Sequence, residues 1–222
     1  MISAYSVQSV NTSHSREEQL TLELLEAINE RNDLSQRNLA KHLGVALGLT
    51  NSYLKRCVRK GYIKVTQIPA NRYLYYLTPH GMAEKSRLTA RYLSTSLNFY
   101  RQASESCEAI YKECSDNGHK RMLLCGDSEL AEIAFLRALE NGIDVLGLFD
   151  AQSQRKRFFS KPVWRNQFPE LDSNDAVLIT DLSEPLRTFR AIVERIDERK
   201  VFVPGVLGMT ELLTTNGAKA SM

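Results

Sequence analysis

The second half of the chain alternates short apolar runs with helical patterns, and this alternation restricts the fold more than any other feature. The runs RMLLCG, DVLGLFD, DAVLITD and KVFVP are typical of buried strands, and helical patterns cover residues 128–140 and the segment EPLRTFRAIVERI. Strands that alternate with helices form parallel sheets, and runs as apolar as AVLIT are buried on both faces. Residues 118–222 are therefore predicted to form a Rossmann-like α/β domain.

The first half of the chain shows three helices followed by two short strands. Residues 17–31 carry an apolar helical stripe, a second helix lies between the capping residues 33–35 and Gly44, and a third covers residues 47–60 before Gly61. Two β-type runs, residues 63–67 and 73–77, flank a turn-rich tip. This order predicts a winged helix-turn-helix over residues 17–79, preceded by a mobile polar tail over residues 1–16.

The winged-helix segment carries charge of one sign. Residues 34–83 contain no Asp or Glu, whereas the chain from Gly118 to its end holds 14 basic and 15 acidic residues. The basic residues of the first segment are Arg37, Lys41, Lys55, Arg56, Arg59, Lys60, Lys64 and Arg72. A one-signed field of this kind indicates a polyanion partner, and we predict double-stranded DNA.

The third helix is the predicted recognition helix, because in this motif it enters the major groove, where each base pair displays its own donor and acceptor pattern. Its outward residues Asn51, Ser52 and Lys55 are predicted to contact base edges. Phosphate contacts, which set register and supply salt-dependent affinity, are predicted for Ser35, Lys41, Arg56 and Arg59. Arg72 at the wing tip is placed to reach a minor groove.

Two segments of this half resemble a known family. LSQRNLAKHLGVALGLTNSYLKRCVRKGYIKV and YYLTPHGMAEKSRLTARYL are similar to MarR-type winged-helix regulators, in particular the branch associated with exopolysaccharide gene clusters. The resemblance spans about residues 20–100 and implies a transcriptional regulator of polysaccharide or cell-surface genes. Further on, LLCGDSELAEIAFLRALENGIDVLGLFD resembles the Rossmann-like domains behind some regulators of this type, and the N-terminal sugar-nucleotide domain of certain acyltransferases.

Residues 80–117 are predicted to form a linker helix. An apolar stripe along it has a spacing of about 3.5 residues, typical of a helix that packs on a partner helix, and consists of Leu93, Leu97, Tyr100, Cys107, Tyr111 and Cys114. One reading is a two-fold homodimer that sets two recognition helices about one duplex turn apart. The other is that the stripe covers the chain's own second domain.

Residues 126–131 partly match the dinucleotide-binding pattern G-x-G-x-x-G. Gly126 supplies the turn glycine and Ala131 replaces the third, but Ser128 stands where the pyrophosphate would press on the backbone, and Asp127 adds a negative charge. Two readings stay open: a nucleotide or nucleotide-sugar effector binds at this sheet edge, or the domain is degenerate and serves dimerisation or partner contact. A ligand site would comprise Gly126, Asp127, Ser128, Glu129, Asp150, Thr180 and Asp181, with Asp150 as the ribose-binding acid. Ser128 has capping of the next helix as its alternative role.

No motif indicates catalysis. The chain contains no G-x-S-x-G, H-E-x-x-H or Walker pattern, and Asp150, Thr180 and Asp181, at strand ends where α/β sites gather, have helix capping as the alternative role. The basic segment QSQRKRFFSKPVW is predicted to be a solvated loop, with a phosphorylated ligand as the alternative.

The cysteines and the apolar runs indicate the compartment. Cys57, Cys107, Cys114 and Cys125 form no C-x-x-C pair and lie in apolar patterns, which predicts buried thiols in a reducing cytoplasm, with neither zinc nor a disulfide. No apolar run approaches the ~20 residues of a membrane span, and the N-terminus lacks the pattern of a signal peptide.

The sequence thus predicts a cytoplasmic, non-enzymatic regulator of transcription that binds DNA through its winged helix. Its second domain would be a ligand sensor or an assembly module. The alternative is a nucleotide- or nucleotide-sugar-binding protein, or an enzyme, whose winged helix is only an interaction module.

Overall fold

The computed structural model describes residues 4–69 and 72–209, and the side chains of residues 16–69 and 73–209. The chain divides into two compact units, Met1–Ser96 and Leu97–Met222. The division falls inside one long helix, α4 (Pro79–Asp116), whose first part belongs to unit 1 and whose second part belongs to unit 2.

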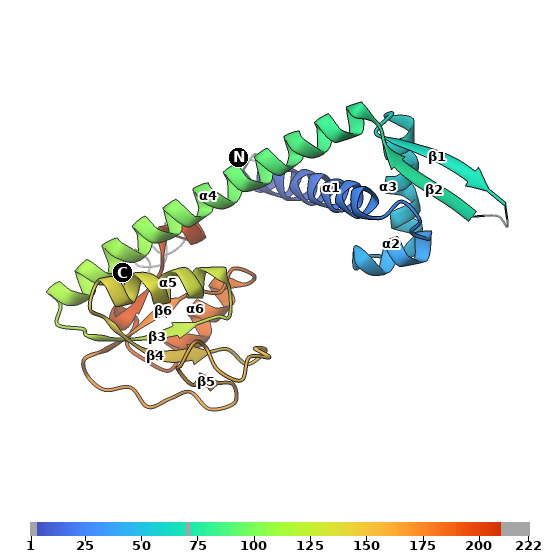
Figure 1. The fold of residues 1–222 in the computed structure, drawn as a ribbon. Coiled ribbons are helices and arrows are strands. Elements are labelled where there is room, and N and C mark those ends of the chain that lie inside the picture. Colours follow the sequence, from blue (N-terminus) through green and yellow to red (C-terminus); the bar gives the residue numbers. More distant parts are fainter. Residues whose placement is uncertain (1–3, 70–71, 210–222) are drawn as a thin grey trace. The chain divides into compact units, whose positions relative to one another are not determined.

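Unit 1 is a winged helix-turn-helix. Helices α1 (Ala4–Glu30), α2 (Gln36–His42) and α3 (Leu47–Arg59) are followed by strands β1 (Ile63–Ile68) and β2 (Arg72–Leu77). The two strands pair antiparallel, with Ile63 opposite Leu77, and form the wing (Figure 1). This confirms the predicted order of elements.

The first helix begins earlier than predicted. We expected a mobile tail up to residue 16 and a helix from Glu17, whereas α1 begins at Ala4. Residues 4–16 contain neither proline nor glycine, so no helix breaker lies between Ala4 and the apolar stripe. The predicted start is corrected accordingly.

The core of unit 1 fixes which face of α3 is turned outward. Thr50, Leu54 and Cys57, at the predicted i, i+4, i+7 spacing, are buried, and Leu54 and Cys57 join a cluster that includes Leu25 of α1 and Tyr75 of β2. The opposite face of α3 is left for solvent or a partner. Helical periodicity alone predicted this orientation, because residues three and four apart share one face.

Unit 2 contains a five-stranded parallel sheet. Its elements are β3 (Arg121–Cys125), α5 (Glu129–Glu140), β4 (Asp144–Phe149), β5 (Val163–Trp164), β6 (Asp175–Ile179), α6 (Pro185–Val193) and β7 (Val201–Phe202), with short 3₁₀ turns at Glu198–Lys200 and Gly205–Leu207. The strand order β5-β4-β3-β6-β7 is that of a Rossmann-like sheet, in which the order reverses between the first and fourth strands, here β3 and β6. The predicted α/β domain is therefore confirmed.

The two faces of this sheet have separate cores. Met122 and Leu124 of β3 point to the face covered by α5 and by the second part of α4. Leu123 and Cys125 point to the other face, where Phe189 of α6 packs. Alternating side chains of one strand thus serve both layers, which explains why the predicted strands are apolar throughout.

The apolar stripe of α4 is buried in one part of the helix and exposed in another. Cys107, Tyr111 and Cys114 are buried in the core of unit 2, and the Tyr111 hydroxyl donates to the carbonyl of Ala134 at 2.7 Å. For this part of the stripe the second reading holds: it covers the chain's own domain. Leu93 and Leu97, by contrast, are both 53% exposed.

All four cysteines are buried and free, as predicted. Desolvation by burial raises the pKa of the Cys57 thiol to about 11 and the pKa of Cys107 to about 12. Neutral, buried thiols of this kind are poor nucleophiles and poor metal ligands.

The loop between β4 and β6 was incompletely predicted. We expected residues 152–164 to be a solvated basic loop, but Val163 and Trp164 form the edge strand β5, parallel to β4. Phe158 in the same segment is fully buried. Two-residue strands carry too little periodicity to be found in a sequence.

Candidate DNA-binding surface and sheet-edge crevice

The outward face of α3 presents cations. Lys55 and Arg59 are exposed, and both line a groove of about 310 Å³ between α3 and the wing, where Val58, Val65 and Tyr73 supply apolar surface. Lys41 of α2 is exposed as well. These cations lie on the helix-turn-helix, where phosphate and base contacts are made in DNA readers of this architecture.

The other residues predicted to contact DNA differ in their exposure and in their hydrogen bonds within the chain. Ser52 is exposed, and its hydroxyl donates to the carbonyl of Gly48 at 3.0 Å. Asn51 is half-buried, and its Oδ1 is buried without a hydrogen-bond partner among the described residues. Ser35 is the N-cap of α2 and accepts from the backbone N–H of Asn38 at 3.1 Å. The side chain of Arg72 lies outside the described residues.

Arg56 is paired inside the protein. Its guanidinium forms an ion pair with Glu17 of α1. Close by, Glu18 pairs with Arg91 at 2.9 Å and Glu84 with Arg87 at 2.8 Å. These pairs could not be predicted from the charge pattern, because all three acids lie outside the acid-free segment, residues 34–83.

The Glu17–Arg56 ion pair determines whether Arg56 of α3 is available to bind a DNA phosphate. We expect Glu17→Gln to release Arg56 and to tighten DNA binding by about 2- to 5-fold, with the slope of log K against log salt steeper by about one contact. Fluorescence anisotropy at several salt concentrations measures both. Glu30→Gln, an exposed acid at the end of the same helix, is the control. Unchanged affinity and slope in Glu17→Gln would contradict a phosphate role for Arg56.

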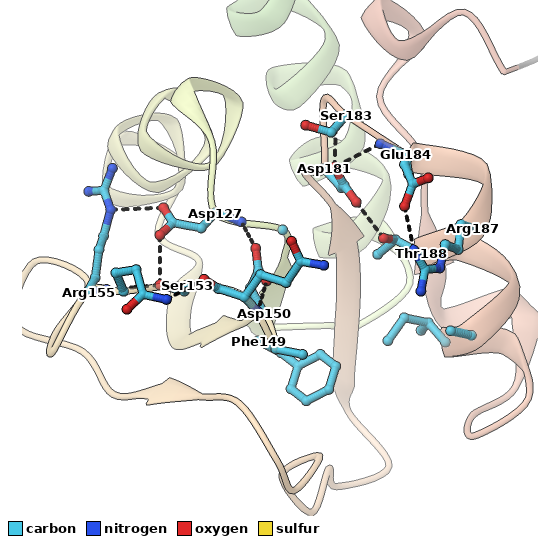
Figure 2. Close-up of a pocket in the computed structure, with 16 residues that line it drawn as sticks. Asp127, Phe149, Asp150, Ser153, Arg155, Asp181, Ser183, Glu184, Arg187 and Thr188 are labelled. Atoms are coloured by element: carbon cyan, nitrogen blue, oxygen red, sulfur yellow. Dashed lines mark hydrogen bonds and ion pairs between the residues drawn. The ribbon is translucent and has the colours of Figure 1, made fainter. Parts of the chain in front are cut away.

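A crevice in unit 2 lies at the carboxyl ends of β3, β4 and β6. Its volume is about 700 Å³ (Figure 2). Gly126, Asp127, Asp150 and Asp181 of the predicted ligand site line it. Ser128, Glu129 and Thr180 are not among its lining residues.

Gly126 is required by the backbone at this edge. Its φ is +114°, and an added Cβ would lie 2.4 Å from the backbone nitrogen of Asp181. Non-glycine residues avoid this region of φ, and the approach is closer than any van der Waals contact. The predicted turn glycine is therefore confirmed, and it is also the point where the loops after β3 and β6 meet.

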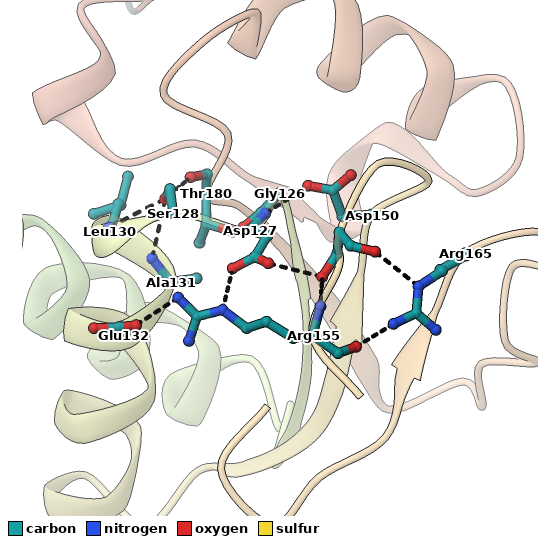
Figure 3. Close-up of polar contacts among 11 residues, drawn as sticks. Gly126, Asp127, Ser128, Leu130, Ala131, Glu132, Asp150, Arg155, Arg165 and Thr180 are labelled. Atoms are coloured by element: carbon teal, nitrogen blue, oxygen red, sulfur yellow. Dashed lines mark hydrogen bonds and ion pairs between the residues drawn. The ribbon is translucent and has the colours of Figure 1, made fainter. Parts of the chain in front are cut away.

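Ser128 is used by the fold. It is the N-cap of α5, and its Oγ accepts from the backbone N–H groups of Leu130 at 3.1 Å and Ala131 at 3.4 Å. The same hydroxyl donates to the carbonyl of Thr180, whose own hydroxyl donates to the carbonyl of Gly126 at 2.7 Å (Figure 3). The capping role, left open by the sequence, is the one that Ser128 performs.

Removing this hydroxyl should destabilise unit 2. We expect Ser128→Ala to lower the free energy of unfolding by about 1–2 kcal/mol, because one N-cap is lost and the Thr180 carbonyl loses a donor. Urea titration followed by the fluorescence of Trp164, the sole tryptophan, measures the loss. Ser173→Ala, an exposed serine of the same unit, should change little. Equal stability of the two variants would contradict the capping role.

Asp150 and Asp127 hold the loop rather than face the crevice as free acids. One oxygen of Asp150 accepts from the backbone N–H of Asp127 at 2.8 Å, and the other accepts from that of Gln152 at 2.7 Å. The Asp127 carboxylate accepts from the Ser153 hydroxyl at 2.7 Å and pairs with Arg155 at 2.8 Å. Arg155 therefore binds an acid of its own chain.

Asp181 lies at the start of the loop that leads into α6. It accepts from the backbone N–H groups of Ser183 at 2.8 Å and Glu184 at 3.1 Å, and from the Thr188 hydroxyl at 2.6 Å. Burial alone would raise the pKa of this carboxyl, but these hydrogen bonds, with Arg187 nearby, bring it below its usual value. Asp181 is thus an ionised, turn-forming residue; it does not cap α6, whose N-cap is Glu184.

Comparison with known proteins identifies the first unit. Residues 17–64 match the family model of the winged helix-turn-helix DNA-binding domain. No curated protein matches the chain. Within the residues that the structure describes, no helix is long and apolar enough to cross a membrane.

Solved structures similar to the chain resemble parts of it only loosely. Streptococcus pneumoniae FabT in complex with DNA is 25% identical over 35% of this chain and 55% of its own length, with a TM-score of 0.30. The PcaV transcriptional regulator of Streptomyces coelicolor is 18% identical over 41% of this chain and 76% of its own length, with a TM-score of 0.35. Human N-acetylserotonin methyltransferase in complex with SAM is 14% identical over 81% of this chain and 71% of its own length, with a TM-score of 0.29.

Proposed function

We propose that this protein is a sequence-specific DNA-binding regulator of transcription. The observation that carries the proposal is the exposed cationic face of α3, with Lys55 and Arg59, on a winged helix-turn-helix that matches a DNA-binding family model. Arg59 and Lys55 are suited to phosphate and to guanine acceptors, and Ser52 to base edges of either kind.

We also propose that the regulator is a homodimer. Four large apolar residues in the middle of α4, namely Tyr92, Leu93, Leu97 and Tyr100, are 40–55% exposed. Exposed apolar residues gathered along one helix favour association with a second copy. A two-fold pair would present two recognition helices to two half-sites of an operator.

The role of unit 2 and the target genes follow as finer parts of the proposal. Unit 2 would sense a small molecule or assemble the dimer, and a sensor works only if its ligand binds the DNA-competent and incompetent states unequally. Polysaccharide or cell-surface genes are the proposed targets, on the strength of the LTPHGMAEKSRLTARYL resemblance, and the cytoplasm is the proposed compartment. A catalytic role has no support, since Asp150, Thr180 and Asp181 are engaged in holding loops.

Binding to DNA upstream of the chain's own operon tests the main proposal. We expect anisotropy titrations to show tighter binding to that duplex than to a scrambled one, with affinity falling steeply as salt is raised. Light scattering of the free protein gives the oligomeric state. Equal, weak binding to every duplex would contradict the proposed regulator function. A monomer at micromolar concentration would contradict the proposed homodimer.

A further inference from the structure

Three backbone donors at the first turn of unit 2, where a phosphate would bind, already have acceptors. In Rossmann-like domains a pyrophosphate sits on the N–H groups of the first turn and of the helix that follows. Here the N–H of Asp127 donates to the Asp150 carboxylate, and the N–H groups of Leu130 and Ala131 donate to the Ser128 hydroxyl (Figure 3). A phosphate that used these three N–H groups would have to displace the chain's own oxygens.

The charges that line the crevice also oppose an anion. The lining holds four carboxylates and two guanidinium groups, namely Asp127, Asp150, Asp181 and Glu184, and Arg155 and Arg187 (Figure 2). Both guanidinium groups already form ion pairs within the chain. Arg155 pairs with Asp127 and Glu132, and Arg187 pairs with Glu184. Asp150 and Asp181 form no ion pair with any side chain that the structure describes.

The segment that supplies Ser153 and Arg155 is itself held in place. Arg165 donates through Nε to the carbonyl of Ser153 at 2.8 Å, and through Nη2 to the carbonyl of Arg155. Arg155 reaches across to Glu132 of α5 at 2.7 Å. The contacts on Asp127 are therefore part of a connected network, and opening them for a phosphate would break several hydrogen bonds together.

Space for a ligand nevertheless remains. The crevice volume of about 700 Å³ lies within the range of small-molecule sites, and Phe149, Ala151, Ala191 and Ile192 give it apolar surface. It also lies at the reversal of strand order between β3 and β6, where α/β sheets bind ligands. Size and position fit a small molecule, while the polar lining fits hydroxyl or cationic groups.

We propose that this crevice is a small-molecule site that rejects phosphate, so that its ligand is a neutral or cationic compound and not a nucleotide, dinucleotide or nucleotide sugar. The carboxylates of Asp127 and Asp150 exclude the anion, and the apolar surface holds the body of the ligand. The proposal excludes a nucleotide or nucleotide-sugar effector, which the pattern of residues 126–131 had left possible. The proposal does not depend on DNA binding by unit 1.

Calorimetric titration of the full chain with ADP tests the proposal, with adenosine as the phosphate-free probe. We expect the wild type to bind ADP with a Kd weaker than about 1 mM. The variant Asp127→Asn/Asp150→Asn should bind ADP at least about 10-fold more tightly, because two negative charges near the phosphates are removed while the side-chain shapes are kept. The adenosine affinity should stay the same. Glu113→Gln, an exposed acid of unit 2 on α4, should leave both affinities unchanged.

Trp164 fluorescence shows whether each variant is folded, and the single variant Asp150→Asn, with a smaller expected gain, replaces the double variant if that one unfolds. Three results would overturn the proposal: a wild type that binds ADP more tightly than adenosine, a folded variant that binds ADP as weakly as the wild type, or an equal gain for adenosine and ADP. The last would mean that space, and not charge, had kept the nucleotide out.

Discussion

The Lys55→Ala/Arg59→Ala variant should bind operator DNA about 100-fold more weakly than the wild type. Each side chain is exposed on the outward face of α3, and a lost base or phosphate contact of this kind weakens binding by about 1–3 kcal/mol. The slope of log K against log salt should fall by about one contact, because Arg59 is the one of the two assigned to phosphate. Anisotropy titrations on the preferred duplex at several salt concentrations measure both quantities.

Lys112→Ala is the matched control, since it removes an exposed cation from α4 in unit 2. Its affinity should stay within about 2-fold of the wild type, as expected for a surface charge that does not belong to the winged helix. If the double variant and the control bind alike, α3 is not the recognition helix. The winged helix would then be an interaction module, which is the alternative that the sequence left open.

Gly126→Ala should strongly destabilise unit 2. The added Cβ would lie 2.4 Å from the Asp181 nitrogen, and the φ of +114° is strained for any side chain. Strain and overpacking together should cost about 3–5 kcal/mol, a large part of the ~5–15 kcal/mol that stabilises a typical domain. Urea titration followed by Trp164 fluorescence reports on this unit.

Gly142→Ala is the control for a positive φ without a close contact. Gly142 also has a positive φ, +69°, but an added Cβ there would meet no atom within 4 Å. This variant should therefore lose only about 1–2 kcal/mol, the cost of the backbone conformation alone. Equal losses in the two variants would show that the contact between the loops after β3 and β6 does not restrict Gly126.

Much of the fold could be predicted from local patterns. The i, i+4, i+7 spacing of Thr50, Leu54 and Cys57 identified the buried face of α3, and the apolar runs identified β3, β4, β6 and β7. Both follow from the geometry of single elements, because the side-chain periods of helix and strand are fixed by the backbone. The start of α1 and the two-residue strand β5 escaped, since a polar helix and a short strand have no apolar period to detect.

The candidate sites divide in the same way. The sequence by itself determined that the winged helix is basic, that α3 turns Lys55 and Arg59 outward, and that Gly126 makes a turn, because these depend on composition, period and backbone conformation within one segment. Only the tertiary structure decided that Arg56 pairs with Glu17, that the Ser128 hydroxyl donates to the Thr180 carbonyl, and that Asp150 takes the N–H of Asp127. Each of these contacts joins residues from different elements, and a carboxylate or hydroxyl keeps the same chemistry in sequence whether its partner is a ligand or the chain itself.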